Sequence, residues 1–139
     1  MTTAHRKLTA PAPGFAEQAA AFTSFRALEQ GVPAAWVRSL ESQGLTRDDI
    51  RRIIPDRTLD RRIAKGEMLK IEEADGLARL LRVVKAARDL FENDENADMF
   101  LRSPNPALGE RIPIHMAQTD IGAREVETII GRLSHGIYS

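Results

Sequence analysis

The sequence predicts an all-α protein. Apolar residues recur at three- and four-residue steps in most segments of the chain, which is the spacing of one face of an α-helix. Glycine and proline stand at the ends of these segments, where helices commonly stop and start. We find no convincing alternation of apolar and polar residues of the kind that marks a half-buried strand, and no internal repeat. The 139 residues suffice for one ordinary domain or two very small ones.

Two helices are predicted in the N-terminal region, after an arm at residues 1–14. The arm contains prolines and small polar residues and is expected to be disordered. The first helix covers residues 15–30 and ends at Gly31, and the second opens at Pro33 and ends at Gly44. The residues predicted to face inward are Phe15, Ala19, Phe22, Phe25, Leu28, Trp36, Val37 and Leu40.

A pair of short helices follows, at residues 46–54 and 58–65. The hydroxyl of Thr46 suits the N-cap of the first helix, and Pro55 ends that helix. Thr58 is predicted to cap the second helix. Two short successive helices joined by a tight turn are typical of a helix-turn-helix, in which the second helix lies in the DNA major groove.

The C-terminal half is predicted to contain one long helix and two shorter ones. The long helix runs from about Ile71 to Glu92 and carries the wide apolar stripe that a buried face needs. Asp94 is predicted to cap a short helix, and Asp120 to cap the last helix, which ends at Gly136. The apolar residues of the three helices are Leu77, Leu80, Leu81, Val84, Ala87, Leu90 and Phe91; Ala97, Met99, Phe100 and Leu101; and Ala123, Val126, Ile129, Ile130 and Leu133.

The composition argues against several classes of protein. Hydrophobic residues make up 42% and charged residues 29%, which fits a globular chain. No apolar run approaches the roughly 20 residues that span a bilayer, and the N-terminus lacks the apolar core of a signal peptide. A cytoplasmic location without a membrane partner is expected. Cysteine is absent, and His5, His115 and His135 lack metal-ligand spacing, so no catalytic residue, metal, cofactor or enzyme activity is predicted.

The second helix of the short pair carries the main candidate DNA-binding residues. If its apolar residues face the core, its basic residues point outward, where arginine can pair with guanine edges. Residues 46–70 hold eight basic and five acidic residues, the largest basic excess in the chain. The first helix and the turn are expected to add phosphate contacts. The predicted DNA-binding residues are Arg51, Arg52, Arg57, Thr58, Arg61, Arg62 and Lys65.

The same arginines are also compatible with the solvated face of an ordinary helical bundle. Asp60 weakens the DNA interpretation, because it would repel phosphate unless it contacts a cytosine amino group. An excess of three positive charges predicts poor DNA binding by a monomer, so specific binding would need a dimer. The N-terminal helices, with their large supply of aromatic residues, are where we first expect the dimer surface.

The C-terminal run PNPALGERIPIHMAQTDIGAREVETIIGRLSHGIYS, residues 104–139, resembles the toxin-binding domain of the Xre/MbcA/ParS antitoxins. Members of that family carry a similar order of Asn-Pro-Ala-Leu-Gly, an apolar-proline step, a Thr, Gly-Ala-Arg-Glu-Val-Glu, and Gly-Arg-Leu-x-His-Gly-Ile/Val. The upstream RTLDRRIAKGEMLKIEEADGLARLLRVV looks like the family's helix-turn-helix and connecting helix. His115 and Met116 depart from the family pattern, so no role is assigned to them.

This resemblance implies an organisation and a set of partners for the chain. Residues 15–70 would form an Xre-like helix-turn-helix domain for DNA binding and dimerisation, and a long helix would join it to a toxin-binding domain at residues 71–139. Antitoxins of this family pair with a RES-type toxin, which consumes NAD, and cover its active site. They also repress their own operon by binding its operator DNA, and they commonly form homodimers.

The resemblance also implies the toxin-binding residues. The prolines of the segment fix its backbone, which reduces the entropy lost on docking. Leu108 is expected to anchor the segment to its own domain, Asn105 to hold its turn, and the tail after Gly136 to reach into the toxin's NAD pocket. The predicted toxin-binding residues are Asn105, Leu108, Arg124, Glu125, Arg132, His135, Ile137, Tyr138 and Ser139.

Two alternatives stay open at this point. Arg124 and Glu125 could form only local pairs within the helix, and Arg132 and His135 could only offset the helix dipole. The chain as a whole could be a stand-alone Xre-like transcriptional regulator whose C-terminal domain dimerises or senses a ligand. A neighbouring gene for a RES-type protein would favour the antitoxin.

Overall fold

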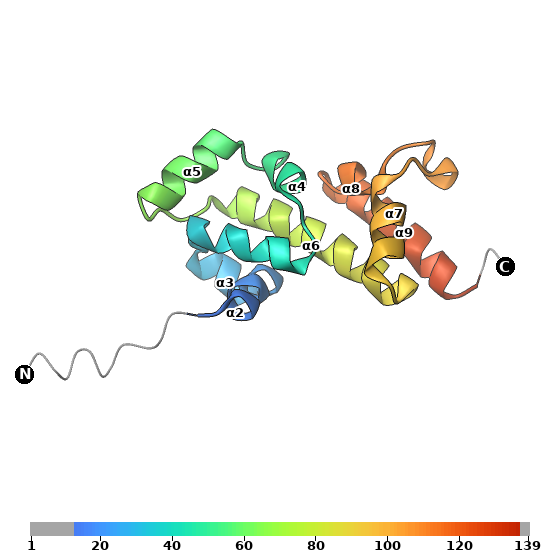
Figure 1. Ribbon diagram of the computed structural model, residues 1–139, viewed down its shortest axis with the longest axis horizontal. Coiled ribbons are helices and arrows are strands. Elements are labelled where there is room, and N and C mark those ends of the chain that lie inside the picture. The colour runs from blue at the N-terminus through green and yellow to red at the C-terminus, as the bar shows by residue number, and fades with distance from the viewer. Residues whose placement is uncertain (1–12, 137–139) are drawn as a thin grey trace, which may run out of the picture.

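The computed structural model describes residues 13–136, and this part of the chain is helical without a named strand, which confirms the all-α class (Figure 1). Only two isolated bridges occur within it, Pro33–Met68 and Asn105–Arg111. The helices are α2 (Phe15–Ala20), η1 (Ala21–Thr23), α3 (Phe25–Gln30), η2 (Ala34–Gln43), α4 (Arg47–Arg51), α5 (Asp56–Ala64), α6 (Ile71–Phe91), α7 (Asp94–Arg102), η3 (Pro106–Leu108), α8 (Pro113–Met116) and α9 (Asp120–Ser134).

The long helix α6 runs through the molecule and holds its two halves together (Figure 1). It packs against η1 and α3 in the N-terminal half and against α7, α8 and α9 in the C-terminal half. Its fully buried leucines, Leu77, Leu80 and Leu81, each contribute about 2 kcal/mol by leaving water. One hydrophobic core includes buried residues from Ala19 to Ile130, and the domain boundary predicted between residues 70 and 71 falls at the start of the helix that both halves share.

The first predicted helix, residues 15–30, is wrong as a single element. The chain leaves the helical conformation at Ser24 (φ −118°, ψ 117°), whose hydroxyl accepts a hydrogen bond from the Ala27 N–H at 3.2 Å and caps α3. The break lets Phe22 enter the core, while Phe15 and Phe25 are exposed rather than inward. The second predicted helix is present as the 3-10 helix η2, and Gly44 ends it with φ 102°.

The two short helices predicted at residues 46–54 and 58–65 are present as α4 and α5. Thr46 caps α4 as predicted: its hydroxyl accepts from the Asp49 N–H at 3.1 Å, and Asp49 in turn accepts from the Thr46 N–H at 2.8 Å. The predicted cap at Thr58 is wrong. The Pro55 carbonyl already accepts from the Leu59 N–H at 3.0 Å, so α5 begins at Asp56 and Thr58 lies in its first turn.

Two further caps lie one residue earlier than predicted. Asn93, not Asp94, caps α7 by accepting from the Asn96 N–H at 3.1 Å, and Thr119, not Asp120, caps α9 by accepting from the Gly122 N–H at 3.0 Å. The two aspartates occupy the first helical turns, where their charge favours the positive end of the dipole. The apolar face of α9 is confirmed, whereas Met99 of α7 is exposed and does not join the core.

The predicted arm, residues 1–14, lies outside the described residues except for its last two. Gly14 is the N-cap residue of α2, and the Pro13 carbonyl accepts from the Gln18 side chain at 2.9 Å. The predicted toxin-contacting tail, Ile137, Tyr138 and Ser139, also lies outside the described residues.

Candidate interaction surfaces

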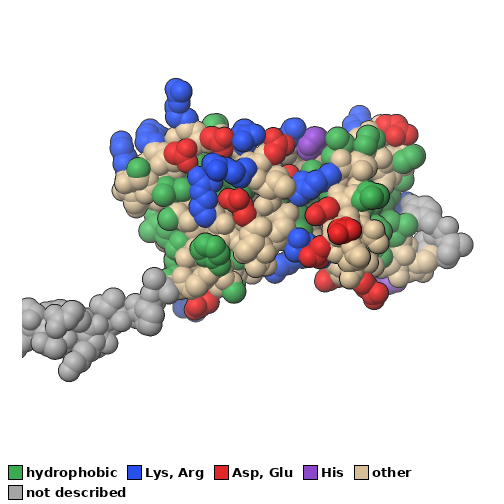
Figure 2. Space-filling model, viewed as in Figure 1, with side chains coloured by type: hydrophobic (Ala, Val, Ile, Leu, Met, Phe, Trp, Pro, Cys, Tyr) green, Lys and Arg blue, Asp and Glu red, His purple; other side chains and the backbone are tan. Residues whose placement is uncertain are grey.

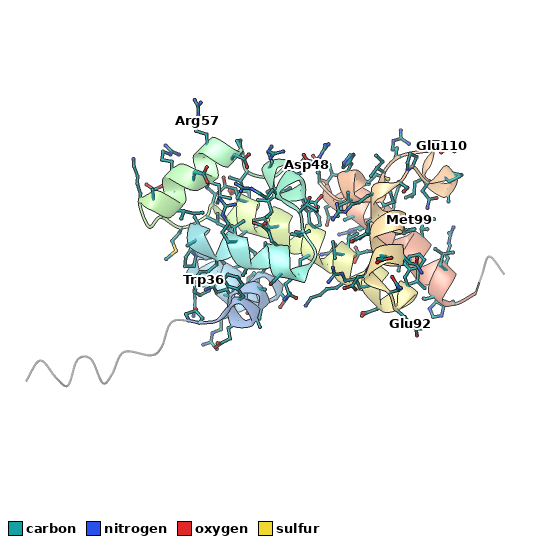
Figure 3. The ribbon with its side chains drawn as sticks, in the orientation of Figure 1. Trp36, Asp48, Arg57, Glu92, Met99 and Glu110 are labelled. Carbon is teal, nitrogen blue, oxygen red and sulfur yellow. The ribbon has the colours of Figure 1, made fainter. Side chains whose placement is uncertain are left out.

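Three basic side chains project from the outer face of α5. Arg57, Arg61 and Lys65 are all exposed, and none of them forms an ion pair within residues 13–136. Figure 3 shows Arg57 pointing away from the body of the molecule, and Figure 2 shows Lys and Arg side chains, with Asp and Glu side chains between them, along the edge formed by α5 and α4. These three residues therefore occupy the position predicted for DNA contact.

Arg62 does not point outward, contrary to the prediction. It is buried, and its Nη1 donates to Oε1 of Glu73 on α6. The same Glu73 oxygen accepts from the Lys70 N–H at 2.8 Å and so caps the start of α6. Arg62 is buried because it lies one helical turn after the buried Leu59, on the same face of α5. Arg62 therefore fixes α5 against α6 rather than offering its charge to DNA.

The remaining predicted DNA-binding residues lie on or near α4. Arg51 donates through Nε to Asp56 at 2.9 Å and through Nη1 to Asp48 at 3.1 Å, and the hydrogen bond to Asp56 raises the pKa of this exposed guanidinium. Arg52 donates to Asp48 at 3.4 Å. Asp48 and Asp56 thus partly offset the positive charges of Arg51 and Arg52. Thr58 is half-buried in the first turn of α5.

Asp60, which counted against DNA binding, has its own partner in the structure. Its Oδ1 accepts from Nη2 of Arg38 on η2 at 2.8 Å. The pair offsets the negative charge on the exposed side of α5 and ties that helix to η2.

In the C-terminal half, Asn105 organises the loop between α7 and α8. Its carbonyl accepts from the N–H groups of Leu108 (2.9 Å) and Glu110 (2.8 Å), its own N–H donates to the Arg111 carbonyl (3.0 Å), and its side-chain oxygen accepts from the Ala107 N–H (2.8 Å). The predicted turn-holding role is confirmed. A contact between Asn105 and a toxin stays a prediction.

Leu108 anchors this loop to the core, as expected. Only 6% of its surface is exposed, and Ile114 of α8 is similarly buried. The small exposed part of Leu108 lines a groove beside α9, so any toxin contact through it is limited to that part.

The turn from α8 into α9 is held in place from two sides. Arg79 of α6 donates through Nε to the Ala117 carbonyl at 3.0 Å and through Nη2 to the Gln118 carbonyl at 2.6 Å. On the other side, Gly122 packs so closely on α8 that a Cβ there would overlap the Met116 carbonyl oxygen. The glycine of the Gly-Ala-Arg-Glu run is therefore a packing requirement.

Two adjoining grooves lie along the outer side of α9. The larger, of about 700 Å³, lies between α9 and the loop before it, and the smaller, of about 330 Å³, lies between α9 and η3. Ile121 and Glu125 line both, and Ile121 is 74% exposed. We call this continuous surface the α9 groove; its lining includes Pro104, Glu110, Arg111, His115, Met116, Ile121, Arg124, Glu125, Thr128 and Arg132.

Four predicted toxin-binding residues line the α9 groove: Leu108, through its small exposed part, and Arg124, Glu125 and Arg132. Arg124 also pairs with Asp120 at 2.9 Å, but both side chains are largely exposed, so this pair adds little stability. His135 is exposed at the C-terminal end of α9, and neither it nor Asn105 lines the groove.

Sequence reasoning missed the apolar part of the groove. Ile121 lies on the face of α9 that also carries Glu125, Thr128 and Arg132, opposite the buried stripe. An isoleucine out of phase with the buried residues was the available signal. Nothing in the helical pattern indicated that His115 and Met116, from α8, would lie on the same groove, because tertiary packing brings them there.

The described part of the chain contains neither a candidate metal site nor a candidate membrane-spanning helix. Within residues 13–136, no three His, Cys, Asp or Glu side chains come together to hold a metal ion. None of the helices described there has the length and apolar character needed to cross a membrane.

The C-terminal half matches a known class of domain. Residues 86–136, which include α7, the Asn105 loop and the α9 groove, match the antitoxin Xre/MbcA/ParS C-terminal toxin-binding domain. The class of protein that this domain defines is a toxin-binding antitoxin.

Longer matches extend this likeness towards the N-terminus. The chain is 34% identical to Antitoxin Xre of Photorhabdus laumondii over 116 residues, which cover 81% of this chain and 78% of that protein. It is 29% identical to Antitoxin Xre of Pseudomonas putida over 121 residues, covering 86% and 76%. It is 41% identical to Antitoxin Xre of Yersinia enterocolitica over 87 residues, covering 62% of this chain and 59% of that relative's length. The chain therefore belongs to the Xre antitoxin family.

Proposed function

We propose that this chain neutralises a RES-type, NAD-degrading toxin by binding it through the α9 groove and the residues that follow α9. The single observation that carries the proposal is the overlap between the matched toxin-binding domain, residues 86–136, and the residues that build this groove. The groove combines an exposed apolar side chain, Ile121, with a ring of acidic and basic groups. An apolar centre with a polar rim is the usual composition of a protein-binding surface.

The same proposal includes a role in transcription and a second copy of the chain. Arg57, Arg61 and Lys65 on α5 contact operator DNA, and a homodimer supplies two such helices and twice the phosphate contacts. The operon repressed in this way encodes the antitoxin and its toxin. The protein acts in the cytoplasm, where NAD and the operon are both present.

Co-purification tests the toxin part of the proposal. The tagged chain is expressed together with the product of its adjacent gene, and the co-purifying protein is identified. We expect a stoichiometric partner whose expression alone lowers the cellular NAD concentration. A partner that leaves NAD unchanged would overturn the RES-type assignment, and a chain without any partner would favour the stand-alone regulator.

Deleting residues 137–139 tests how the toxin is blocked. If this tail closes the toxin's NAD pocket, the shortened chain still binds the toxin through the α9 groove but no longer restores the NAD concentration. Full neutralisation by the shortened chain would show that the tail is not the blocking element. The matched control is a chain of full length with Ser139→Ala.

A further inference from the structure

A second apolar surface lies in the other half of the molecule, between α3 and the first part of α6. Phe25 is 76% exposed and Ile71 is 54% exposed there. Two adjoining hollows, of about 390 and 290 Å³, share Phe25, Leu28 and Asp75 in their linings. We call this surface the α3–α6 face; it comprises Phe25, Leu28, Ile71, Glu72, Asp75, Ala78, Arg82 and Lys85.

The charges of the α3–α6 face are separated along α6. Glu72 and Asp75 lie near the N-terminal end of the helix, and Arg82 and Lys85 lie about two turns further on. Glu72 and Lys85 are exposed, and neither forms an ion pair within the part of the chain that the structure describes. One end of the face is therefore acidic and the other basic, with Ala78 between them along α6.

Asp75 and Arg82 already have partners within the chain, but both remain open to a second molecule. Asp75 pairs with Arg79 at 3.2 Å and keeps 66% of its side chain exposed. Arg82 pairs with Glu127 of α9 at 2.7 Å and keeps 51% exposed. The hydrogen bond to Glu127 raises the pKa of Arg82.

The charge pattern of the α3–α6 face can pair with the same pattern on a second copy of the chain. The residue pairs 72/85 and 75/82 share one midpoint, between Ala78 and Arg79. In an antiparallel pair of α6 helices, the register that sets Glu72 opposite Lys85 of a second copy therefore also sets Asp75 opposite Arg82 of that copy. The small side chain of Ala78 lies near the two-fold axis, where it lets the helices approach closely. A two-fold interface repeats every contact, so each charge pair occurs twice.

We propose that the α3–α6 face is the homodimer surface of this protein, formed by two copies with antiparallel α6 helices. Phe25 and Leu28, which line both hollows, supply its apolar contacts, Ile71 adds an apolar contact at each end beyond Glu72, and the four charged residues set its register. This inference rests on the homodimer in the proposed function and specifies the surface and the symmetry. The helix break at Ser24 is consistent with this dimer, because Phe22 before the break is buried in the core while Phe25 after it is exposed on the α3–α6 face.

A charge exchange between two variants tests the surface. Glu72→Lys sets two lysines against each other at both ends of the interface, and Lys85→Glu sets two glutamates against each other. Each variant alone is expected to raise the dimer dissociation constant about tenfold or more, because every substitution acts twice. An equimolar mixture is expected to regain a dimer close to wild-type affinity, because one chain then carries two lysines and the other two glutamates. Sedimentation velocity over a concentration series measures each case.

Two further variants separate the apolar contact from general effects. Phe25→Gln is expected to weaken the dimer, and because the side chain is exposed in the monomer, the unfolding temperature should match that of the wild type at a protein concentration where both are monomeric. Met99→Gln, at an exposed apolar residue outside the α3–α6 face, is expected to leave the dimer unchanged.

The outcomes distinguish the surface from the dimer itself. A wild-type chain that stays monomeric at every concentration would overturn both the homodimer and this surface. A wild-type dimer that tolerates both charge variants would overturn the surface and leave the homodimer standing. Two weakened variants that fail to associate when mixed would overturn the antiparallel register.

Discussion

Asp49 on α4 and Arg102 at the end of α7 form a bidentate ion pair across the junction of the two halves. Arg102 Nη1 and Nη2 donate to the two carboxylate oxygens at 2.8 and 2.9 Å, and Nη2 also reaches the Gly44 carbonyl at 3.2 Å. Asp49 is 2% exposed and belongs to the capping box of Thr46. A residue of the matched toxin-binding domain thus supports the first turn of α4.

Replacing Arg102 by methionine tests the strength of this junction. The change keeps most of the side-chain volume but leaves the Asp49 carboxylate buried without its cation. We expect a loss of about 3 kcal/mol in the free energy of unfolding, measured by urea denaturation. Arg124→Met, which removes an exposed pair with Asp120, is the control and should change stability by less than about 1 kcal/mol. Equal effects of the two variants would mean that the buried pair adds no special stability.

Two glycines of α9 provide a matched test of the packing of α8 on α9. In Gly122→Ala the new methyl group would lie 2.8 Å from the carbonyl carbon of Met116, so we expect the unfolding free energy to fall by about 1–3 kcal/mol. In Gly131→Ala the methyl group would meet no atom within 4 Å. That variant is expected to gain up to about 1 kcal/mol from the better helix propensity of alanine. Similar losses of unfolding free energy in the Gly122→Ala and Gly131→Ala variants would refute the close approach of α9 to α8 at Gly122.

Arg61 and Arg62 are neighbours in sequence but should respond differently to substitution by alanine. Arg61→Ala is expected to weaken binding to a promoter fragment by about 1 kcal/mol or more while the unfolding temperature stays the same. Arg62→Ala removes the partner of Glu73 and should lower the unfolding temperature itself. Fluorescence anisotropy with the promoter fragment and thermal unfolding measure the two effects. If Arg61→Ala binds the promoter normally, α5 is not the DNA-reading helix.

Ile121 is the residue of the α9 groove whose substitution should affect toxin binding most selectively. Ile121→Lys places a charge at the centre of the groove, and because the side chain is 74% exposed the fold should not change. We expect the toxin dissociation constant to rise by about 30-fold or more, corresponding to roughly 2 kcal/mol for a central contact. Met99→Lys is the matched control, since Met99 is 67% exposed but does not line the groove. Binding that is unchanged in Ile121→Lys would exclude the groove as the toxin contact.

The sequence by itself determined the helical class, the course of α6 and the apolar side of α9. These features follow from local periodicity, which a single chain displays without reference to its neighbours. The cap at Thr46 and the stops at Gly31 and Gly44 were also predictable, because they depend on residues within one turn. The resemblance of the C-terminal run to the antitoxin domain was likewise a property of the sequence, and the family match confirms it.

Only the tertiary structure decided which charged residues are available to partners. Arg61 and Arg62 are neighbouring residues of the same type, yet Arg62 is buried against Glu73 and Arg61 is exposed. Asp49 lies in the first turn of α4, but its carboxylate also accepts two hydrogen bonds from Arg102, 53 residues away. The physical reason is that burial and ion pairing depend on residues that are distant in sequence. Local patterns fix the helices, whereas the contacts of α5 with η2 and with Glu73 of α6, and the packing of α8 on α9, determine the surfaces that remain exposed.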